Sequence, residues 1–312
     1  MATYHRGEAA AQQRAGLTGQ AALSLAAIGT EVPPVAERFL EQQPMIVVGA
    51  ADGDGRLWAS PLTGAPGFLT VPAPGSLSVD ALPLAEDPLA EVLTDPARRG
   101  PDAVPVGMIA LEPATRRRMR VNGRAEARPG GLRVALDQVI ANCPKYLQKR
   151  THRLLDPAER KAADTGRRVT HGTALTDAQQ RTVKLADTFF VATASDRGDA
   201  DASHRGGRPG FVRVLGPTLL RWPDYVGNAM LLTLGNLEVN PAAGLLFPGW
   251  EDGSALHLSG TARTVWDAAG SADVPGAQRM VEFSVTQVRE ITAASPLRWS
   301  DPEYSRFNPP AR

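Results

Sequence analysis

Cysteine is almost absent from this sequence of 312 residues, and its scarcity limits the sites that the chain can build. The single cysteine, Cys143, can form neither an intramolecular disulfide nor a multi-cysteine metal site, which suits a reducing cytoplasm. Five scattered histidines without a His-Glu-x-x-His motif do not support a dedicated metal centre. The chain also lacks an apolar run of about 18 residues, and residues 1–14 are too polar and acidic for a signal peptide. We therefore expect a cytoplasmic protein without a metal site.

Excess charge of one sign is missing as well. The sequence has 34 basic and 33 acidic residues, a formal net charge of +1, so it has no field that would attract nucleic acid or an anionic membrane. We expect neither as a partner. With 43% hydrophobic residues the chain can bury two cores, because domains commonly have about 100–150 residues.

A repeat is the main feature that is present. Segment 202–214 matches segment 59–71 without a gap, 143 residues earlier, with identical Ala, Ser, Gly, Pro, Gly, Phe and Val. A second pair of segments, 107–125 and 244–262, matches at an offset of 137. The change of offset indicates an insertion or deletion in the loop between the two windows.

Each copy has short apolar strands, hairpin turns and a leading helix, as in 45–50 and 189–193. This pattern predicts mainly β structure with flanking helices (α+β), arranged as a pair of small antiparallel barrels. We predict a capping box at Thr176 and a helix through Leu136, Val139, Ile140 and Cys143, which follow at helical spacing. The predicted parts are an N-terminal helical segment 1–32 with one helix over 7–28, a first lobe 33–150, a connection 151–175 and a second lobe 176–312.

Cationic residues distinguish the two copies. The second copy alone carries His204, Arg205 and Arg208; the first has Pro61, Leu62 and Ala65 there. The first copy alone carries Arg118, Arg120 and Asn122, which share one face of a predicted strand; the second has Ala255, His257 and Ser259 there. We infer that the two basic sets meet around one anionic cofactor between the lobes. The related site on the other side has lost these basic groups and would bind no cofactor. A charged edge strand that resists aggregation is the alternative for the arginine strand.

Two further segments offer binding groups. In 225–230, Gly227 and Asn228 follow a predicted strand, and Asn228 is a typical N-cap whose helix start would favour a phosphate. A capped junction without a ligand is the alternative. In 142–148, Lys145 and Tyr146 supply a cation and a phenol. His204 and Tyr146 are the candidates for acid–base catalysis.

Taken together, these segments resemble the pyridoxamine 5′-phosphate oxidase-related, FMN-binding split-barrel proteins in their tandem form. The resemblance rests on 202–215 (ASHRGGRPGFVRVL), 223–237 (PDYVGNAMLLTLGNL), 240–247, 118–123 (RMRVNG), 142–148 (NCPKYLQ) and 296–309. It implies two tandem split β-barrels forming an intrachain pseudo-dimer, with FMN in a cleft between them. It also implies redox chemistry on a small-molecule substrate, with NAD(P)H or a reductase as electron donor, and it leaves a homodimer open.

The resemblance also assigns roles to single residues. Ser203, Arg208 and Val212 would flank the isoalloxazine, whereas Asp224, Gly227 and Asn228 would hold the ribityl chain and phosphate. The complete predicted set of cofactor-binding residues is Ser203, His204, Arg205, Arg208, Val212, Asp224, Gly227, Asn228, Arg118, Arg120, Asn122, Lys145 and Tyr146.

The function implied is that of an FMN-dependent oxidoreductase acting on an unidentified small molecule. The alternatives are FAD or haem as the cofactor, and a non-catalytic flavin- or haem-binding protein. Ala229, Leu231 and Leu232 are aliphatic where the pattern has polar or aromatic residues, so a structural dimerisation module stays open. The Arg–His substrate motif of the vitamin B6 oxidases is absent from 296–312, so oxidation of pyridoxamine phosphate does not follow.

Overall fold

The computed structural model describes residues 2–95, 103–142, 144–267 and 273–310. The strands of the first lobe are β1 (Ile28–Gly29), β2 (Met45–Ala51), β3 (Leu57–Thr63), β4 (Leu69–Ala73), β5 (Ser76–Val79), β6 (Val104–Glu112), β7 (Arg117–Arg128) and β8 (Gly131–Asn142). The strands of the second lobe are β10 (Val169–Gly172), β11 (Thr188–Ala194), β12 (Ala200–Gly206), β13 (Arg213–Gly216), β14 (Leu219–Tyr225), β15 (Ala242–Pro248), β16 (Ala255–Val265) and β17 (Ala277–Ile291). The remaining elements are β9 (His152–Leu154), β18 (Leu297–Trp299), α1 (Arg6–Arg14), α2 (Thr18–Leu25), α3 (Pro34–Glu41), α4 (Ala90–Thr94), α6 (Pro157–Thr165), α7 (Asp177–Leu185), α8 (Leu232–Val239) and a 3₁₀ turn, Pro113–Thr115.

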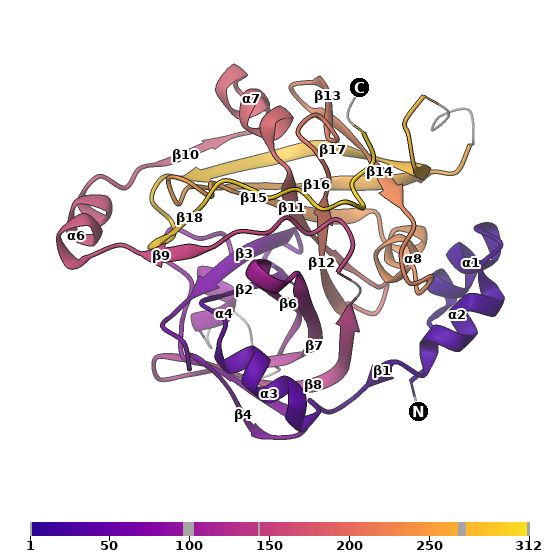
Figure 1. Cartoon of the computed structure of the whole chain (residues 1–312), viewed down its shortest axis with the longest axis horizontal. Coiled ribbons are helices and arrows are strands. Elements are labelled where there is room, and N and C mark those ends of the chain that lie inside the picture. The colour runs from indigo at the N-terminus through magenta and orange to yellow at the C-terminus, as the bar shows by residue number, and fades with distance from the viewer. Residues whose placement is uncertain (1, 96–102, 143, 268–272, 311–312) are drawn as a thin grey trace.

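Two eight-stranded antiparallel sheets with the same connectivity make up the fold. The first has the order β3-β2-β6-β7-β8-β5-β4 with β1 beside β8, and the second has β12-β11-β15-β16-β17-β14-β13 with β10 beside β17. Figure 1 shows the first lobe, mainly in purple, below the second, which runs from pink through orange to yellow. The predicted mainly β fold, two tandem split barrels paired within one chain, is confirmed.

The duplication seen in the sequence is also present in the element boundaries. Strands β2 and β11 begin 143 residues apart, and so do β3 and β12 and the helices α3 and α7. The predicted capping box at Thr176 opens α7, where the Thr176 side chain accepts from Gln179 N. Each lobe buries its own apolar core, and a third cluster of buried apolar residues lies where the lobes meet.

Glycines allow the two barrels to approach closely. A Cβ on Gly107 of β6 would lie 2.3 Å from Asp201 Cα, and a Cβ on Gly244 of β15 would lie 2.5 Å from Trp58 Cα. Gly107 and Gly244 are related by the offset of 137, so the same close contact occurs on both sides of the interface. Any side chain at either position would push the lobes apart.

The N-terminal segment differs from the prediction of one helix over 7–28. Gly16, at φ +68°, ends α1, and the chain restarts as α2. Ile28 and Gly29 then pair with β8 as the short strand β1. In Figure 1 the helices α1 and α2 lie beside α8 of the second lobe, where Gly7 packs on Gly235 O.

The helix predicted through Leu136, Val139 and Ile140 was wrong, because these residues belong to strand β8. A β-bulge opposite Asn122/Gly123 shifts the register, so Leu136 and Val139 both face the core although they are three residues apart. Ile140 packs into a separate cluster. The resulting spacing imitates a helix. Cys143 lies outside the described residues.

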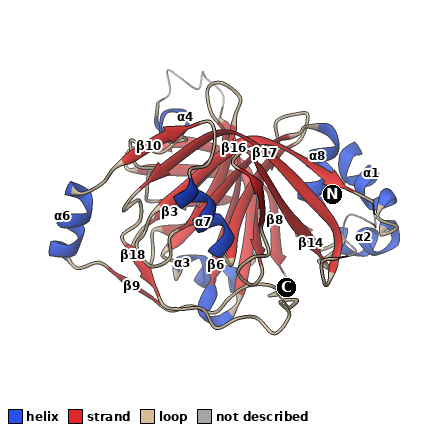
Figure 2. Ribbon diagram, turned by 90° about the horizontal axis from the view of Figure 1, so that it is seen from above, coloured by secondary structure: helices blue, strands red, loops and turns tan. Residues whose placement is uncertain are grey.

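The predicted connection 151–175 contains regular elements. Strand β9 pairs with β18 near the C-terminus, α6 follows, and β10 pairs with β17 of the second sheet. Figure 2 shows α6 projecting at one end of the molecule, with α1 and α2 at the other.

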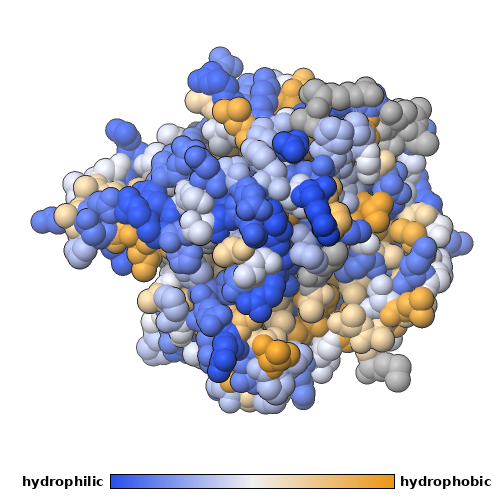
Figure 3. All heavy atoms as spheres, viewed as in Figure 1, coloured by the Kyte–Doolittle hydropathy of each residue, from blue (hydrophilic) through white to orange (hydrophobic). Residues whose placement is uncertain are grey.

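None of the helices in the described ranges is long and apolar enough to cross a membrane. On the face drawn in Figure 3, hydrophilic residues dominate the centre, and apolar residues appear mainly toward the lower edge and the right.

Candidate functional site

A cavity lies between the lobes where β7 faces β12, β14 and the segment 226–231. Its enclosed volume is about 110 Å³. Ten of the thirteen predicted cofactor-binding residues line it: Arg118, Arg120, Lys145, Tyr146, Ser203, His204, Arg205, Asp224, Gly227 and Asn228. The structure therefore brings together two members of each basic set, Arg118 and Arg120 from the first lobe and His204 and Arg205 from the second.

Two side chains of β7 reach across the interface to β12. Arg118 Nη1 lies 2.9 Å from His204 Nδ1, and Arg120 Nη1 donates to Asp201 Oδ1 at 2.9 Å. Because a guanidinium can only donate, Nδ1 of His204 is the acceptor of the first bond.

The state of His204 follows from that bond and from burial. Burial, with the Arg118 and Arg205 cations as further causes, lowers the pKa of His204 well below its usual value. The ring is therefore neutral at pH 7 and carries its single proton on Nε2. Nε2 is buried and has no hydrogen-bond partner in the described part of the chain.

Asp224 sits between two arginines of its own lobe. Arg205 Nη1 donates to Asp224 Oδ1 at 3.1 Å, and Arg279 Nη1 lies 3.5 Å from Asp224 Oδ2. Both carboxylate oxygens thus face protein cations. Asp224 fixes Arg205 at the wall of the cavity.

Two tyrosines stand together in the lining. Their ring centroids are 5.0 Å apart, and the Tyr146 hydroxyl donates to Val226 O at 3.1 Å. Tyr146 has a left-handed backbone, φ +63°, which is unfavourable for a residue other than glycine. Burial, followed by the nearby Tyr146, raises the pKa of Tyr225 to about 12, so this phenol stays protonated at neutral pH.

The segment 226–231 is irregular, and Asn228 does not cap a helix as predicted. Helix α8 begins only at Leu232, and its N-cap, Leu231, is left-handed and makes no side-chain cap. Ala229 is left-handed too, at φ +63°. Asn228 Oδ1 instead accepts from Met230 N, which stabilises the turn itself.

The N-terminal helices hold this segment from outside, a role that sequence patterns did not signal. Gln12 Nε2 of α1 donates to Met230 O at 2.9 Å, and Ser24 Oγ of α2 donates to Asn228 O at 2.6 Å. Other residues that the prediction missed are Phe211, Pro223, Tyr225 and Thr233. All but Phe211 lie in segment 223–237, whose similarity to the family pattern marked the region without selecting them.

Three predicted residues do not line the cavity. Arg208 stacks over the Tyr304 ring at 5.1 Å and lines a different, smaller depression. Val212 is a core residue, 1% exposed. Asn122 faces a second cavity on the other side of Asp201.

The position related to this site by the duplication is built differently. Ser60, the counterpart of Ser203, donates to Asp87 Oδ1 at 2.6 Å, and Asp87 Oδ2 lies 3.9 Å from His257 Nε2. His257 stands where the first copy has Arg120, and it is fully buried. A groove beside this cluster is lined by five carboxylate residues and two arginines, which makes it unsuited to a phosphate.

Comparison with known proteins places the second lobe in a family. Residues 175–296 match the family model described as pyridoxamine 5′-phosphate oxidase. No curated protein matches the chain. Similar solved structures include a HupZ variant from Group A Streptococcus, with 13% identity over 37% of this chain and 98% of that chain and a TM-score of 0.31. The FAD binding protein from Mycobacterium smegmatis has 15% identity over 39% of this chain and 98% of its own, with a TM-score of 0.28. HutZ, the haem storage protein from Vibrio cholerae, has 14% identity over 38% of this chain and 95% of its own, with a TM-score of 0.27.

Proposed function

Through its second lobe the chain belongs to the pyridoxamine 5′-phosphate oxidase-related split-barrel family, and on this basis we propose that it binds FMN between its lobes. The protein would then be a flavin-dependent oxidoreductase that acts on a small molecule. The proposal rests on the residues of the cavity between β7 and β12.

Unsatisfied donors are the observation that carries the proposal. Arg120 Nε, Arg205 Nε and His204 Nε2 are buried and lack partners among the described residues, and all three belong to residues that line the cavity. Each of these nitrogens carries a hydrogen, so each needs an acceptor. A flavin nucleotide offers acceptors in its ring carbonyls, ribityl hydroxyls and phosphate. The donor set therefore fits this group.

The space available requires the segment 226–231 to move. Ligand pockets usually enclose about 300–1,000 Å³, whereas this cavity has about 110 Å³. The segment is held by single hydrogen bonds from Gln12, Ser24 and Tyr146, and Ala229 and Leu231 have left-handed backbones. Such strain lowers the cost of rearrangement. We assign the opening of the site to this segment.

The chain's own residues would bind, orient and exclude water. Arg118 and Lys145 supply positive charge from the first lobe, and Arg205, fixed by Asp224, supplies it from the second. His204 would donate from Nε2 to an acceptor of the ligand, while Tyr225 stays a neutral phenol that can donate but not ionise. When bound, a flavin accepts or gives a hydride, and a nicotinamide cofactor or a reductase would complete the cycle.

His204 also bears on haem, the alternative cofactor. An imidazole ligates iron through a nitrogen lone pair. In His204 the Nδ1 lone pair accepts from Arg118, and Nε2 carries the proton. Haem ligation would require breaking the bond to Arg118, so the present geometry favours flavin.

The test begins with the cofactor spectrum. The full chain, freed of bound ligand, is titrated with FMN, FAD and haem, and the visible spectrum and flavin fluorescence are followed. We expect FMN to bind, and we expect the bound flavin to be reduced by NADH, NADPH or a reductase and reoxidised by a small-molecule acceptor. Lack of flavin binding would overturn the proposal, and binding without any reduction would leave a non-catalytic flavin carrier.

A matched pair of variants locates the site. Arg118→Met removes a cation that lines the cavity, and Arg208→Met removes one that lies outside it. A charged hydrogen bond is worth about 1.5–3 kcal/mol, so Arg118→Met should weaken FMN binding about 10- to 150-fold. Arg208→Met should bind as the unaltered chain does. Equal loss in both variants would place the flavin elsewhere.

A further inference from the structure

A second cavity lies on the other side of Asp201 and takes no part in the proposed flavin site. It has a volume of about 630 Å³ and is bounded by α1, the paired strands β7 and β8, and the start of β12. Asp201 separates the two cavities: its Oδ1 accepts from Arg120, which lines the first, and from Asn122, which lines the second. The size is within the range of about 300–1,000 Å³ for small-molecule sites.

Glu8 brings a buried carboxyl into this cavity. It is 5% exposed and is held by a capping box, in which Glu8 Oε2 accepts from His5 N at 2.9 Å. Its backbone lies directly on Gly235 of α8, where a Cβ would come within 2.5 Å of Glu8 Cα. The carboxyl is therefore fixed in place by the crossing of two helices.

His5 is the nearest ring to that carboxyl, with His5 Nε2 3.7 Å from Glu8 Oε1, but both of its ring nitrogens are engaged elsewhere. Its Nδ1 accepts from Gly7 N at 3.1 Å, and its Nε2 lies 3.0 Å from Asn236 Oδ1. Asn236 Nδ2 donates to Thr193 Oγ1, so Asn236 Oδ1 is an acceptor and His5 Nε2 must donate to it. Both ring nitrogens thus make hydrogen bonds to groups other than the Glu8 carboxyl.

The arginines around the cavity are engaged or exposed. Arg6 pairs with Asp196 at 2.6 Å, and Arg124 pairs with Asp199 at 2.7 Å. Arg197 lies exposed, where water screens its charge. Within the described ranges Glu8 thus has no arginine or lysine at ion-pair distance, although buried carboxylates normally have one.

Asn122 adds a second unmatched acceptor. It is 6% exposed, and its Nδ2 donates to Gln138 Oε1 at 3.2 Å and to Asp201 Oδ1 at 3.1 Å. These two bonds fix the orientation of the amide. They leave Asn122 Oδ1 buried and without a partner in the part of the chain that the structure describes.

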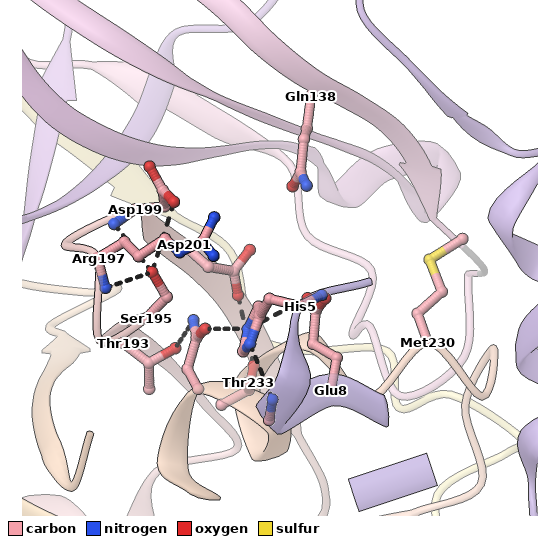
Figure 4. Close-up of polar contacts among 12 residues, drawn as sticks. His5, Glu8, Gln138, Thr193, Ser195, Arg197, Asp199, Asp201, Met230 and Thr233 are labelled. Carbon is pink, nitrogen blue, oxygen red and sulfur yellow. Dashed lines mark hydrogen bonds and ion pairs between the residues drawn. The ribbon is translucent and has the colours of Figure 1, made fainter. Parts of the chain in front are cut away.

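We infer that this second cavity binds a small organic cation, an ammonium or guanidinium, between Glu8 and Asn122. Figure 4 shows Gln138 pointing down toward the Glu8 carboxyl, with His5 and Asp201 alongside. A cation with several N–H groups satisfies both needs of the site. Its charge neutralises the Glu8 carboxylate, and its hydrogens reach the carboxylate and the Asn122 carbonyl oxygen.

Proton release gives the inference a specific signature. Burial raises the pKa of Glu8 to about 7, with nearby Asp201 adding to the rise and Arg120 opposing it. The titratable and charged groups that face Glu8 are Tyr4, His5, Asp201 and Arg120. Because a bound cation favours the ionised carboxyl, binding near pH 7 should release a fraction of a proton from Glu8.

The experiment uses agmatine and putrescine as probes and butanediol as the uncharged control. Isothermal titration calorimetry of the full chain is run near pH 7 in two buffers of different ionisation enthalpy, which yields the protons exchanged. We expect at least one cation to bind with a Kd of about 1 mM or tighter, with proton release, and butanediol not to bind. Absence of binding by both cations, equal binding of butanediol, or binding without proton release would overturn the inference.

Variants separate this site from the flavin site. Glu8→Gln keeps the side-chain volume and should weaken cation binding about tenfold or more and abolish proton release. Asn122→Val removes the second acceptor and should also weaken binding, whereas Asp137→Asn at the exposed rim should not. FMN affinity should be the same in Glu8→Gln as in the unaltered chain. Cation binding that survives in both Glu8→Gln and Asn122→Val would contradict the inference, whatever the outcome for FMN.

Discussion

Arg120 and Asp201 form a buried ion pair between the two lobes, with 2.9 Å between Arg120 Nη1 and Asp201 Oδ1 and side chains 12% and 5% exposed. Removing one partner leaves the other charge buried and alone. We therefore expect Asp201→Asn to lower the free energy of unfolding by about 3–5 kcal/mol, measured by urea denaturation at neutral pH.

The matched control is the exposed pair between the same two lobes. Arg124 and Asp199 are 42% and 56% exposed, so Asp199→Asn should cost less than about 1 kcal/mol. A similar loss in the two variants would mean that the Arg120–Asp201 pair is not desolvated as the structure has it.

Gly107 tests the close packing of the barrels. A Cβ there would lie 2.3 Å from Asp201 Cα, in the backbone of the other lobe, so the lobes must shift to accept it. We expect Gly107→Ala to lower the free energy of unfolding by about 1–3 kcal/mol. Gly53→Ala, where a Cβ meets nothing within 4 Å, should change it by less than about 0.5 kcal/mol.

The raised pKa of Glu8 makes the stability of the folded chain depend on pH. Its pKa is about 7 in the folded chain, against 4.5 as the ordinary value, so the folded state binds more protons between these values. Stability is therefore highest below pH 4.5 as far as this group is concerned, and it falls as pH rises toward 7, by about 3 kcal/mol. Glu8→Gln should flatten this part of the profile and stabilise the chain at pH 8. If Glu8→Gln and the parent differ in free energy of unfolding by the same amount throughout this pH range, Glu8 is not the source of the pH dependence.

The hydrogen bond from Gln12 to Met230 O limits the mobility of segment 226–231 over the candidate flavin cavity. Replacing it by Leu leaves Met230 O without its buried donor, which costs about 1–3 kcal/mol and favours opening of 226–231. Amide exchange in this segment, followed by mass spectrometry, should become about tenfold faster. Gln13→Leu changes the adjacent exposed residue and should leave exchange in 226–231 unaltered. Equal exchange in the two variants would show that α1 does not hold the segment.

The repeat allowed most of the fold to be predicted. Because the offset of 143 holds from α3 to β3, one lobe predicts the other, and the paired barrels follow. Strand β8, which was predicted as a helix, shows where this prediction from sequence fails. The bulge opposite Asn122 puts Leu136 and Val139 on the same side of the strand, and the bulge is visible only in the pairing of β8 with β7. Periodicity within one segment cannot detect a register shift set by its neighbour.

The part of the candidate site that could be predicted from the sequence is the part where the two copies of the repeat differ in charge. Each basic set occurs in one copy only, which indicated that His204, Arg205, Arg118 and Arg120 act together, and all four line one cavity. Arg208 belongs to the same short motif, but the turn after β12 directs it to the Tyr304 ring, and no sequence pattern encodes that direction. The contacts of the N-terminal helices with 226–231 join parts of the chain about 200 residues apart, and they likewise depend on the complete fold.

The stoichiometry of FMN binding tests the central claim most directly, namely that the duplicated barrels have kept one site for an anionic cofactor between β7 and β12. Fluorescence titration of the full chain at a concentration well above the Kd gives the number of FMN molecules per chain. We predict one, because the related position holds the buried Ser60–Asp87–His257 cluster instead. Two equivalent sites per chain, or none, would contradict the account.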